Sequence, residues 1–307
     1  MSTAPRPARR AASPEKTRPS VFWPLAAAVI PAVGWFARIE ISGAEHLPAE
    51  GPYVLAPNHY SEFDPLIIAV ATWRMGRAPR FMAKESLFRV PVLGAALRAT
   101  GMVPVARSSS SAAAKVTLEQ SEALVEHDRG VIVYPEGSLT RDPDMWPMRG
   151  KTGAVRVALA GGIPVIPVAT WGVQRILPRY GKLSFWPPRK RVQMKFGPAV
   201  DMSEWEGKVA PAQLAAATDR AMAAVSGLLG ELLTALVVAG AFAAFLATSA
   251  GLVVSLAGVV SQDVFSGSVR SFRLAAVICA LVPLVVALVT APAGLVSSVG
   301  AVFVFAA

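Results

Sequence analysis

The stretch PYVLAPNHYSEFDPLIIAVATWRM, residues 52–75, decides the expected fold. It opens with the apolar run Pro52–Ala56, which is typical of a buried strand, and closes with the helical pattern of Pro65–Met75. An Asp-Pro pair at the start of the helical run is a common helix N-terminus. A strand that leads into a helix through a polar loop is the repeating unit of α/β proteins. His59 falls on that loop, at the carboxyl end of the predicted strand.

The same alternation continues over residues 39–226. Further strands are expected at Arg80–Ala83, Met102–Ala106, Val131–Tyr134, Pro164–Thr170 and Arg191–Phe196, and further helices at Ala112–His127, Lys151–Ala160 and Pro211–Leu229. This order predicts an α/β domain with a mostly parallel sheet and flanking helices. Because two prolines stand in Pro164–Thr170, we expect this strand at a sheet edge or its prolines at the strand's first positions.

The composition excludes several classes of site. The 307 residues include one cysteine, Cys279, which rules out an intrachain disulfide framework and a cysteine-cluster metal site. Three histidines leave little room for a histidine-rich metal centre. We therefore expect no metal and no cofactor. Charged residues make up only 16% of the chain, below the ~25% of ordinary soluble domains.

Two N-terminal segments precede the α/β domain. Residues 1–20 are basic and rich in proline and serine, which predicts a disordered tail. Residues 21–38 are apolar, shorter than a ~20-residue membrane span and interrupted by prolines. A secretory signal peptide is one alternative, but no A-x-A cleavage site follows. We favour a helix or a helix pair lying in the membrane interface, with its tryptophans at headgroup depth.

Residues 227–307 are hydrophobic and carry four charges that sum to zero, so the net charge of +10 belongs to residues 1–226. The runs 232–262 and 274–307 each exceed the ~20 residues that cross a bilayer. They predict two or three transmembrane helices, three if Ala291–Gly294 is a turn. The segment weakly resembles a helix pair of sodium/solute symporters, but so few helices cannot enclose a transport site. A membrane anchor is the better interpretation.

The loop after the first quoted strand carries the residues suited to chemistry. A neutral imidazole such as that of His59 accepts a proton from a hydroxyl near pH 7. A carboxylate on the other ring nitrogen fixes the tautomer and stabilises the imidazolium. Asp64 lies five residues later and reaches His59 if the intervening residues turn. Alternatively, Asp64 is only a helix cap, and His59 is only a polar side chain on the protein surface.

Two further elements offer groups for an anion. Val131–Arg141 is a buried-strand pattern followed by Glu136, Gly137, Ser138 and Arg141 on one loop. Hydroxyls, backbone N–H groups and a guanidinium are suited to phosphate oxygens. Two more cations come from earlier in the chain. Lys84 follows the predicted strand Arg80–Ala83, and Arg107 follows the predicted strand Met102–Ala106. The alternatives are a polar turn with a salt bridge and solvated surface cations.

In this order and spacing, the elements resemble the glycerolipid acyltransferase family, which includes 1-acyl-glycerol-3-phosphate acyltransferases. The resemblance covers about residues 35–225 and rests on Asn-His-x-x-x-x-Asp at 58–64, Pro-Glu-Gly-Ser at 135–138 and Val-Ile-Pro-Val at 165–168. It implies that His59 is the general base on a glycerol hydroxyl and that Asp64 orients it.

The resemblance also implies which residues bind substrate. The loop of Glu136, Gly137 and Ser138 would hold the acceptor's phosphate with nearby basic residues, and Arg107 matches the family's arginine after the third strand. Asn58 and Lys84 complete the substrate-binding candidates. The family commonly has arginine directly after Glu-Gly-Thr, whereas Leu139 stands there in this chain, and Arg141 is the nearest arginine.

The function implied is acyl transfer from acyl-CoA or acyl carrier protein to a lysophospholipid, most simply lysophosphatidate, on the cytoplasmic face of a membrane lipid surface. Either donor is cytoplasmic, and the positive domain suits both the donor and the phosphate. The alternatives are acylation of another lipid or glycolipid, and a membrane anchor or transport component with an inactive enzyme domain. A nucleic-acid partner is not expected, because the cations are scattered among lipid-type motifs.

Overall fold

The computed structural model describes residues 12–105, 111–207, 210–264 and 268–289. By their internal contacts, the residues divide into two compact units, Met1–Leu233 and Thr234–Ala307. The long helix α7 (Pro211–Asp263) contributes residues to both units.

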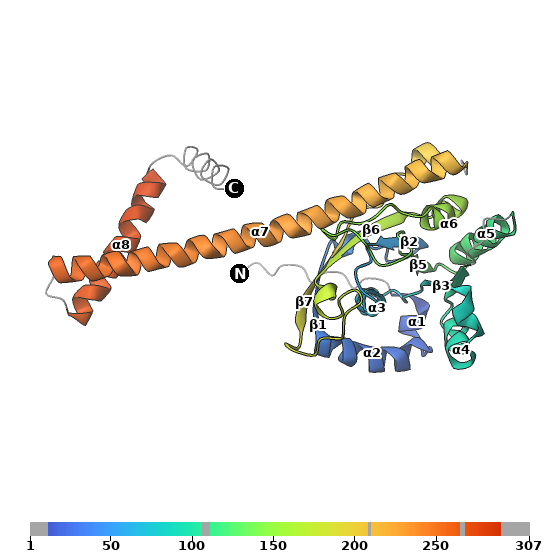
Figure 1. The fold of residues 1–307 in the computed structure, drawn as a ribbon, viewed down its shortest axis with the longest axis horizontal. Helices are drawn as coiled ribbons and strands as arrows, with labels where there is room; N and C mark the ends of the chain where they lie inside the picture. Colours follow the sequence, from blue (N-terminus) through green and yellow to red (C-terminus); the bar gives the residue numbers. More distant parts are fainter. Residues whose placement is uncertain (1–11, 106–110, 208–209, 265–267, 290–307) are drawn as a thin grey trace. The chain divides into compact units, whose positions relative to one another are not determined.

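Within the first unit, strands and helices alternate as expected (Figure 1). The strands are β1 (Ala37–Ser42), β2 (Tyr53–Pro57), β3 (Met82–Lys84), β4 (Val103–Val105), β5 (Gly130–Ile132), β6 (Val165–Trp171) and β7 (Lys190–Phe196). The α-helices before α7 are α1 (Pro14–Thr17), α2 (Phe22–Phe36), α3 (Asp64–Arg74), α4 (Pro91–Ala99), α5 (Ser111–Glu126) and α6 (Gly153–Gly161). Short 3-10 helices are η1 (Ala44–His46), η2 (Glu85–Arg89), η3 (Val173–Arg175) and η4 (Ser203–Trp205).

The main sheet has five strands in the order β1-β7-β6-β2-β5, and β3 and β4 form a parallel pair beside it. A parallel bridge between Phe81 and Ile132 links the pair to β5. All pairings are parallel except that of β6 with β7. The predicted α/β class with a mostly parallel sheet and flanking helices is therefore confirmed. The carboxyl ends of β2 and β5 lie at the same edge of the sheet.

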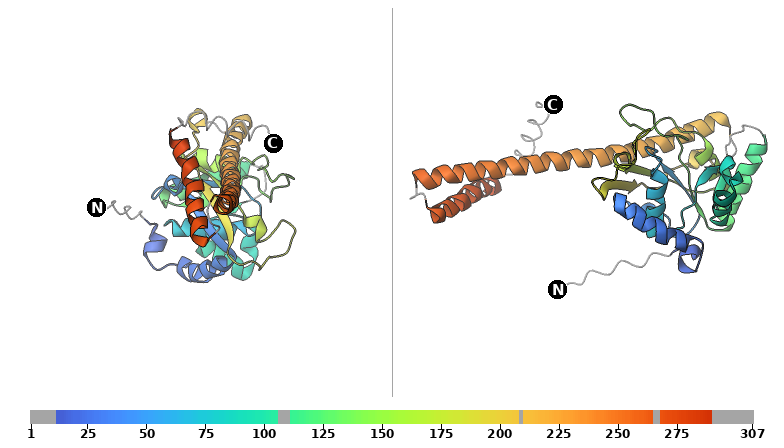
Figure 2. Two further views of the ribbon diagram at one scale, coloured as in Figure 1. Left: turned by 90° about the vertical axis from the view of Figure 1, so that its left-hand side faces the viewer. Right: turned by 60° about the horizontal axis from the view of Figure 1, so that its bottom comes forward.

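Alternating residues of the central strand build two cores, one on each face of the sheet. On β2, Leu55 packs with Val33 of α2 and Ile67 of α3. Its neighbours Val54 and Ala56 point to the other face, in one cluster with buried residues of α5, α6 and the first part of α7. The sheet is thus enclosed by helices on both sides (Figures 1 and 2), as expected for parallel strands.

The predicted disordered tail over residues 1–20 needs a correction at its end. Residues 12–20 include helix α1 and pack against the domain. The backbone N–H of Ser13 donates to Gly76 O at 2.8 Å, and Glu15 forms an ion pair with the buried Arg80. A buried guanidinium needs a partner, and Glu15 supplies one. Residues 1–11 lie outside the described residues.

Residues 21–38, the predicted interfacial segment, form mainly the single helix α2, which contains Pro31. Its inner face buries Phe22 and Val33, whereas Trp23, Leu25 and Trp35 are exposed. An exposed apolar face of this kind is compatible with the membrane interface. The membrane role of α2 stays a prediction.

The proline-containing strand β6 is interior, so the predicted edge position is wrong. Pro164 precedes the strand, and Pro167 stands one residue before Val168, where pairing with β7 begins. The carbonyl of Pro167 accepts a hydrogen bond from Gly197 N at 2.9 Å. The missing N–H therefore falls where the antiparallel ladder does not need it.

The second unit contains the later part of α7 and the helix α8 (Val269–Val289). α8 turns back beside the end of α7, where Ala257 packs with Ala275 and Cys279 (Figure 2). Among the described residues, α7 is the one helix whose length and mean hydropathy suffice to cross a membrane. The expected second and third spans stay predictions, and the expected turn at Ala291–Gly294 lies outside the described residues.

Candidate active site

His59 lies on the loop between β2 and α3, and this loop is fastened to the neighbouring strand. The side chain of Asn58 is fully buried, its Nδ2 donates to Thr170 O at 3.0 Å, and its Oδ1 accepts from Thr170 N at 2.7 Å. Since Thr170 is near the end of β6, these bonds fix the start of the loop to the sheet. The predicted substrate-binding role of Asn58 stays a prediction; in the structure its side chain is bonded to the backbone of Thr170.

His59 and Asp64 meet as the spacing predicted. The distance between His59 Nδ1 and Asp64 Oδ2 is 3.0 Å. The same carboxylate oxygen accepts from the backbone N–H groups of Tyr60 at 2.6 Å and Ser61 at 2.8 Å, which makes the intervening residues turn. With Nδ1–H donating to Asp64, the Nε2 of His59 is left as the nitrogen that accepts a proton.

Asp64 is almost completely enclosed. Its side chain is 3% exposed, against 13% for His59, and its Oδ1 has no hydrogen-bond partner in the described part of the chain. Burial raises the pKa of the Asp64 carboxyl, while the hydrogen bond and charge of His59 act in the opposite direction. His59 is thus the more exposed member of the pair.

The loop after β5 closes on the other side of His59. Glu136 Oε1 accepts from the backbone N–H of His59 at 3.0 Å, and Oε2 accepts from Met148 N at 3.0 Å. Thr140 N donates to the carbonyl of His59 at 2.8 Å. Burial raises the pKa of Glu136, opposed by these backbone donors. The predicted substrate-binding role of Glu136 stays a prediction; in the structure its buried carboxylate accepts hydrogen bonds from the backbone of two loops.

The ring of Tyr134 covers the imidazole. The ring centroids of Tyr134 and His59 are 4.1 Å apart, with an interplanar angle of 25°. Stacking of this kind restricts the orientation of the imidazole. Burial raises the pKa of the Tyr134 hydroxyl well above its ordinary value.

The other predicted residues of this loop lie toward its exposed side. Gly137 has φ +66°, which favours glycine, and a Cβ there would lie 2.8 Å from Nζ of Lys151. Ser138 is half-buried, and Arg141 is exposed, with only its backbone N–H bonded, to Met148 Sδ at 3.3 Å. The loop therefore carries a lysine beside Gly137, a half-buried serine and an exposed arginine.

The remaining two predicted cations are placed differently. Lys84 is the last residue of β3 and pairs in register with Val105 of β4. Because Phe81 bridges Ile132 in parallel, Lys84 comes at the same edge of the sheet as the residues that follow β5. Arg107 lies outside the described residues.

Arg179 belongs to this site and was not predicted. Its Nη1 donates to the carbonyl of Thr140 at 2.6 Å, and its buried Nε has no partner in the described part of the chain. Two residues before Arg179, the carbonyl of Leu177 accepts a hydrogen bond from Ser61 Oγ at 2.7 Å. The sequence signal was the departure at Leu139, where the family commonly has arginine.

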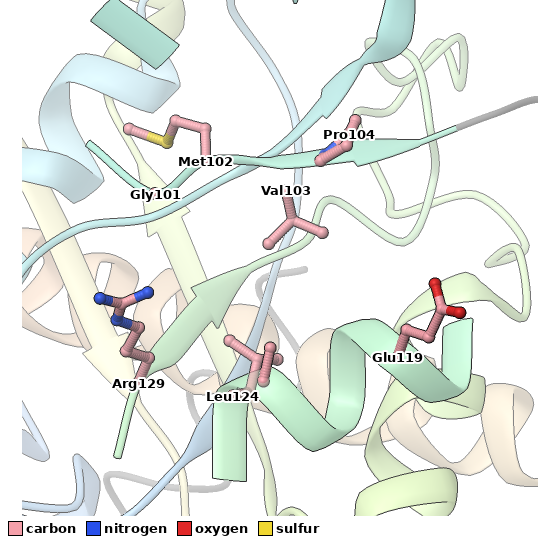
Figure 3. A pocket seen from close by; sticks show the side chains of 8 residues that line it. Gly101, Met102, Val103, Pro104, Glu119, Leu124 and Arg129 are labelled. Carbon is pink, nitrogen blue, oxygen red and sulfur yellow. The ribbon is translucent and has the colours of Figure 1, made fainter. Parts of the chain in front are cut away.

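An apolar cavity of about 220 Å³ is bordered by α2, α3 and residues just before β3 and β4, with Pro65 and Leu66 in its wall directly after Asp64. Another cavity, of about 300 Å³, lies beside β4 and α5 (Figure 3). Figure 3 shows Glu119 and Arg129 on separate elements around it. None of its lining residues comes from the loops that carry His59, Asp64 or Glu136.

Comparison with known proteins points to one family. Residues 38–171 match the family model described as Acyltransferase. The chain is 31% identical over 144 residues to the chloroplastic 1-acyl-sn-glycerol-3-phosphate acyltransferase BAT2 of Brassica napus, covering 47% of this chain and 40% of that protein. It is 30% identical over 131 residues to the human 1-acyl-sn-glycerol-3-phosphate acyltransferase alpha, covering 43% of this chain and 44% of that protein.

A bacterial relative and a solved structure give similar figures. The 1-acyl-sn-glycerol-3-phosphate acyltransferase of Borreliella burgdorferi is 30% identical over 139 residues, covering 45% of this chain and 53% of that protein. The crystal structure of PlsC, the 1-acyl-sn-glycerophosphate acyltransferase from Thermotoga maritima, matches with 24% sequence identity and a TM-score of 0.46. The match covers 64% of this chain and 72% of that chain. The chain thus spans about half or less of the curated relatives that it matches. The family match includes His59, Asp64 and Glu136.

Proposed function

Residues 38–171 form an acyltransferase domain of the glycerolipid acyltransferase family, and from this premise we propose that the protein acylates 1-acyl-glycerol-3-phosphate to give phosphatidate. The observation that carries the proposal is the 3.0 Å contact of His59 Nδ1 with Asp64 Oδ2, beside a loop of anion-binding groups. The acyl donor is acyl-CoA or acyl carrier protein, and the donor meets the site on the cytoplasmic face of the membrane.

In the proposed reaction, Nε2 of His59 takes the proton of the acceptor's free hydroxyl. The oxygen then attacks the thioester carbonyl, a C–O bond forms, and the C–S bond breaks. The proton passes from Nε2 to the departing thiolate. Asp64 stabilises the imidazolium that exists between the two transfers. General base catalysis of this kind typically contributes about 10²–10⁴-fold.

The acceptor's phosphate is proposed to sit against the exposed side of the loop after β5. Ser138 and Arg141 are the sequence-predicted groups there, Lys151 lies over Gly137, and Arg179 adds a guanidinium from the far side of Thr140. Guanidinium and ammonium groups bind phosphate oxygens through charge-assisted hydrogen bonds. The apolar cavity that begins beside Pro65 suits an acyl chain.

The decisive experiment is transfer from labelled acyl-CoA to a panel of lysolipids by the full chain in detergent. We expect activity with lysophosphatidate, abolished in His59→Ala. His127→Ala is a matched control, since His127 is exposed at the C-terminal end of α5, and should keep full activity. Substantial transfer by His59→Ala would refute the catalytic assignment, and a preference for another acceptor would refute the substrate.

A further inference from the structure

The connection that leads into β7 exposes three aromatic side chains. We call residues 180–191, which include the first two residues of β7, the aromatic loop. Tyr180 is 85% exposed, Phe185 62% and Trp186 82%. Soluble surfaces seldom expose several large aromatic groups together, and such patches usually mark an interaction site. Tyrosine and tryptophan are also the residues enriched where a membrane meets water.

The same loop is strongly basic. Its twelve residues include four cations and no acid. Lys190 holds the loop itself, donating to Ser184 O and Pro187 O at 2.8 Å, and Arg191 pairs with Glu40 at 2.7 Å. In the described part of the chain, Lys182 and Arg189 form no ion pair. Their charge is therefore available for an anionic partner, at about 1 kcal/mol per residue near an anionic leaflet.

The aromatic loop is continuous with the exposed face of α2. The backbone N–H of Arg189 donates to Trp35 O at 2.8 Å, and the rings of Phe36 and Phe185 have centroids 5.4 Å apart. Trp35 itself is 61% exposed. Figure 1 shows this loop beside the end of α2 where β1 begins. Two elements that are far apart in the sequence thus present one aromatic surface.

The aromatic loop is also connected to the active site. Arg179, directly before it, is bonded to Thr140, and Thr140 is bonded to His59. Any partner that holds the loop is therefore held close to the catalytic histidine. This connection distinguishes the loop from an exposed hydrophobic patch that is unrelated to the active site.

We propose that the aromatic loop is a second membrane contact which, together with α2, seats the active site on an anionic lipid surface. The inference rests on the proposed function in that the acceptor is a lipid. The positive charge suits an anionic lipid surface and an acidic acyl carrier protein alike, but continuity with the exposed face of α2 supports the lipid surface. The exposed aromatic side chains also suit headgroup depth.

A fluorescent reporter on the loop tests the proposal in the full chain. Cys279→Ala removes the single cysteine, and Lys182→Cys then takes an environment-sensitive label. Leu118→Cys, at an exposed position of α5, is the matched control. In nanodiscs containing phosphatidylglycerol, we expect acrylamide quenching of the loop label to be severalfold weaker than that of the control label. High salt or pure phosphatidylcholine should restore much of the quenching.

Paired variants give an independent readout. Phe185→Ser/Trp186→Ser removes two aromatic anchors, and Leu118→Ser/Val125→Ser removes exposed apolar groups from α5. The loop variant should lose transfer severalfold in nanodiscs and keep it in detergent micelles, while the α5 variant should change in neither. If the loop variant loses activity in both media, the reporter at position 182, on a loop that keeps its three aromatic side chains, decides.

The outcomes separate this inference from the proposed function. Equal acrylamide quenching of both labels in anionic nanodiscs would overturn the membrane contact. Protection of the loop label from quenching that appears only when acyl carrier protein is added would also overturn it. His59→Ala should abolish transfer and leave the protection unchanged. Protection without transfer in the wild type would overturn the proposed function and leave the membrane contact standing.

Discussion

At the residue scale, the site depends on how Asp64 uses its two oxygens. Oδ2 accepts from Tyr60 N, Ser61 N and His59 Nδ1, whereas Oδ1 is buried without a partner in the described residues. An asparagine can place its oxygen at the Oδ2 position, where it still accepts hydrogen bonds. Its amide nitrogen then takes the Oδ1 position, which accepts no hydrogen bond from the described residues. The substitution Asp64→Asn therefore removes the charge while keeping the turn.

We predict that Asp64→Asn lowers kcat by about 10²–10⁴-fold, because the imidazolium of His59 loses its counter-charge. The fold should remain intact by circular dichroism. The measurement is acyl transfer at saturating substrate. Asp144→Asn, at an exposed position of the loop after β5, serves as the control. Near-normal turnover in Asp64→Asn would remove the carboxylate from the mechanism.

Arg179 gives a second prediction at this scale. Its Nη1 donates to Thr140 O, its Nε is buried without a hydrogen-bond partner in the described residues, and the proposed phosphate site uses this guanidinium. We expect Arg179→Gln to raise KM for lysophosphatidate about tenfold or more and to change kcat less, as the loss of a charge-assisted hydrogen bond implies. Arg175→Gln, on the same connection, is the control. An unchanged KM would exclude Arg179 from the phosphate site.

At the scale of elements, Asn58 links the loop after β2 to the end of β6. Removing its side chain leaves the buried N–H and carbonyl of Thr170 without these bonds. We predict that Asn58→Ala lowers the free energy of unfolding by about 1–3 kcal/mol and also reduces turnover. Thr170→Val removes only the hydroxyl contact with Asn58 Oδ1 and should have the smaller effect. Denaturant titration of the two variants is the measurement; equal stability would contradict a fastening role.

The sequence pattern predicted most strands and helices but missed β1 and α4. In β1, Arg38 and Glu40 interrupt the apolar residues, because this strand pairs on one side only, with β7. α4 begins at a proline and contains Gly94, where a Cβ would lie 2.1 Å from Phe88 O. Proline and glycine usually indicate loops, so the close packing that requires this glycine was not visible in the sequence.

The site was predictable where residues are close in sequence or share a sheet edge. The spacing of His59 and Asp64 permits their contact, and parallel strands bring Glu136 to the same edge. The roles of Asn58 and Arg179 were not predictable, since their partners Thr170 and Thr140 lie 112 and 39 residues away. Those contacts depend on strand order and on the path of the connection before β7.

At the scale of the whole molecule, two buried carboxyl groups make stability depend on pH. Burial raises the pKa values of Asp64 and Glu136 in the folded state. Folding therefore favours their protonated forms. The stability contributed by protonation is fully present below their ordinary pKa of about 4 and is lost as the pH rises through the raised values.

We predict that Asp64→Asn is more stable relative to wild type at neutral pH than at acidic pH, because the amide carries no charge to bury. Thermal unfolding of both proteins across this range measures the difference, with Asp144→Asn as the exposed control. A difference in unfolding temperature that does not change with pH would contradict the cause assigned to the shift.

The most direct measurement of the central claim is the position of the proton on His59. NMR of the imidazole nitrogens in the full chain, with isotope-labelled histidine, distinguishes the two neutral tautomers. The His59 signals are assigned by comparison with the His59→Gln variant. We predict that neutral His59 carries its proton on Nδ1, toward Asp64, and has a bare Nε2 that accepts the acceptor's proton. A proton on Nε2 with a bare Nδ1 would contradict the proposed mechanism.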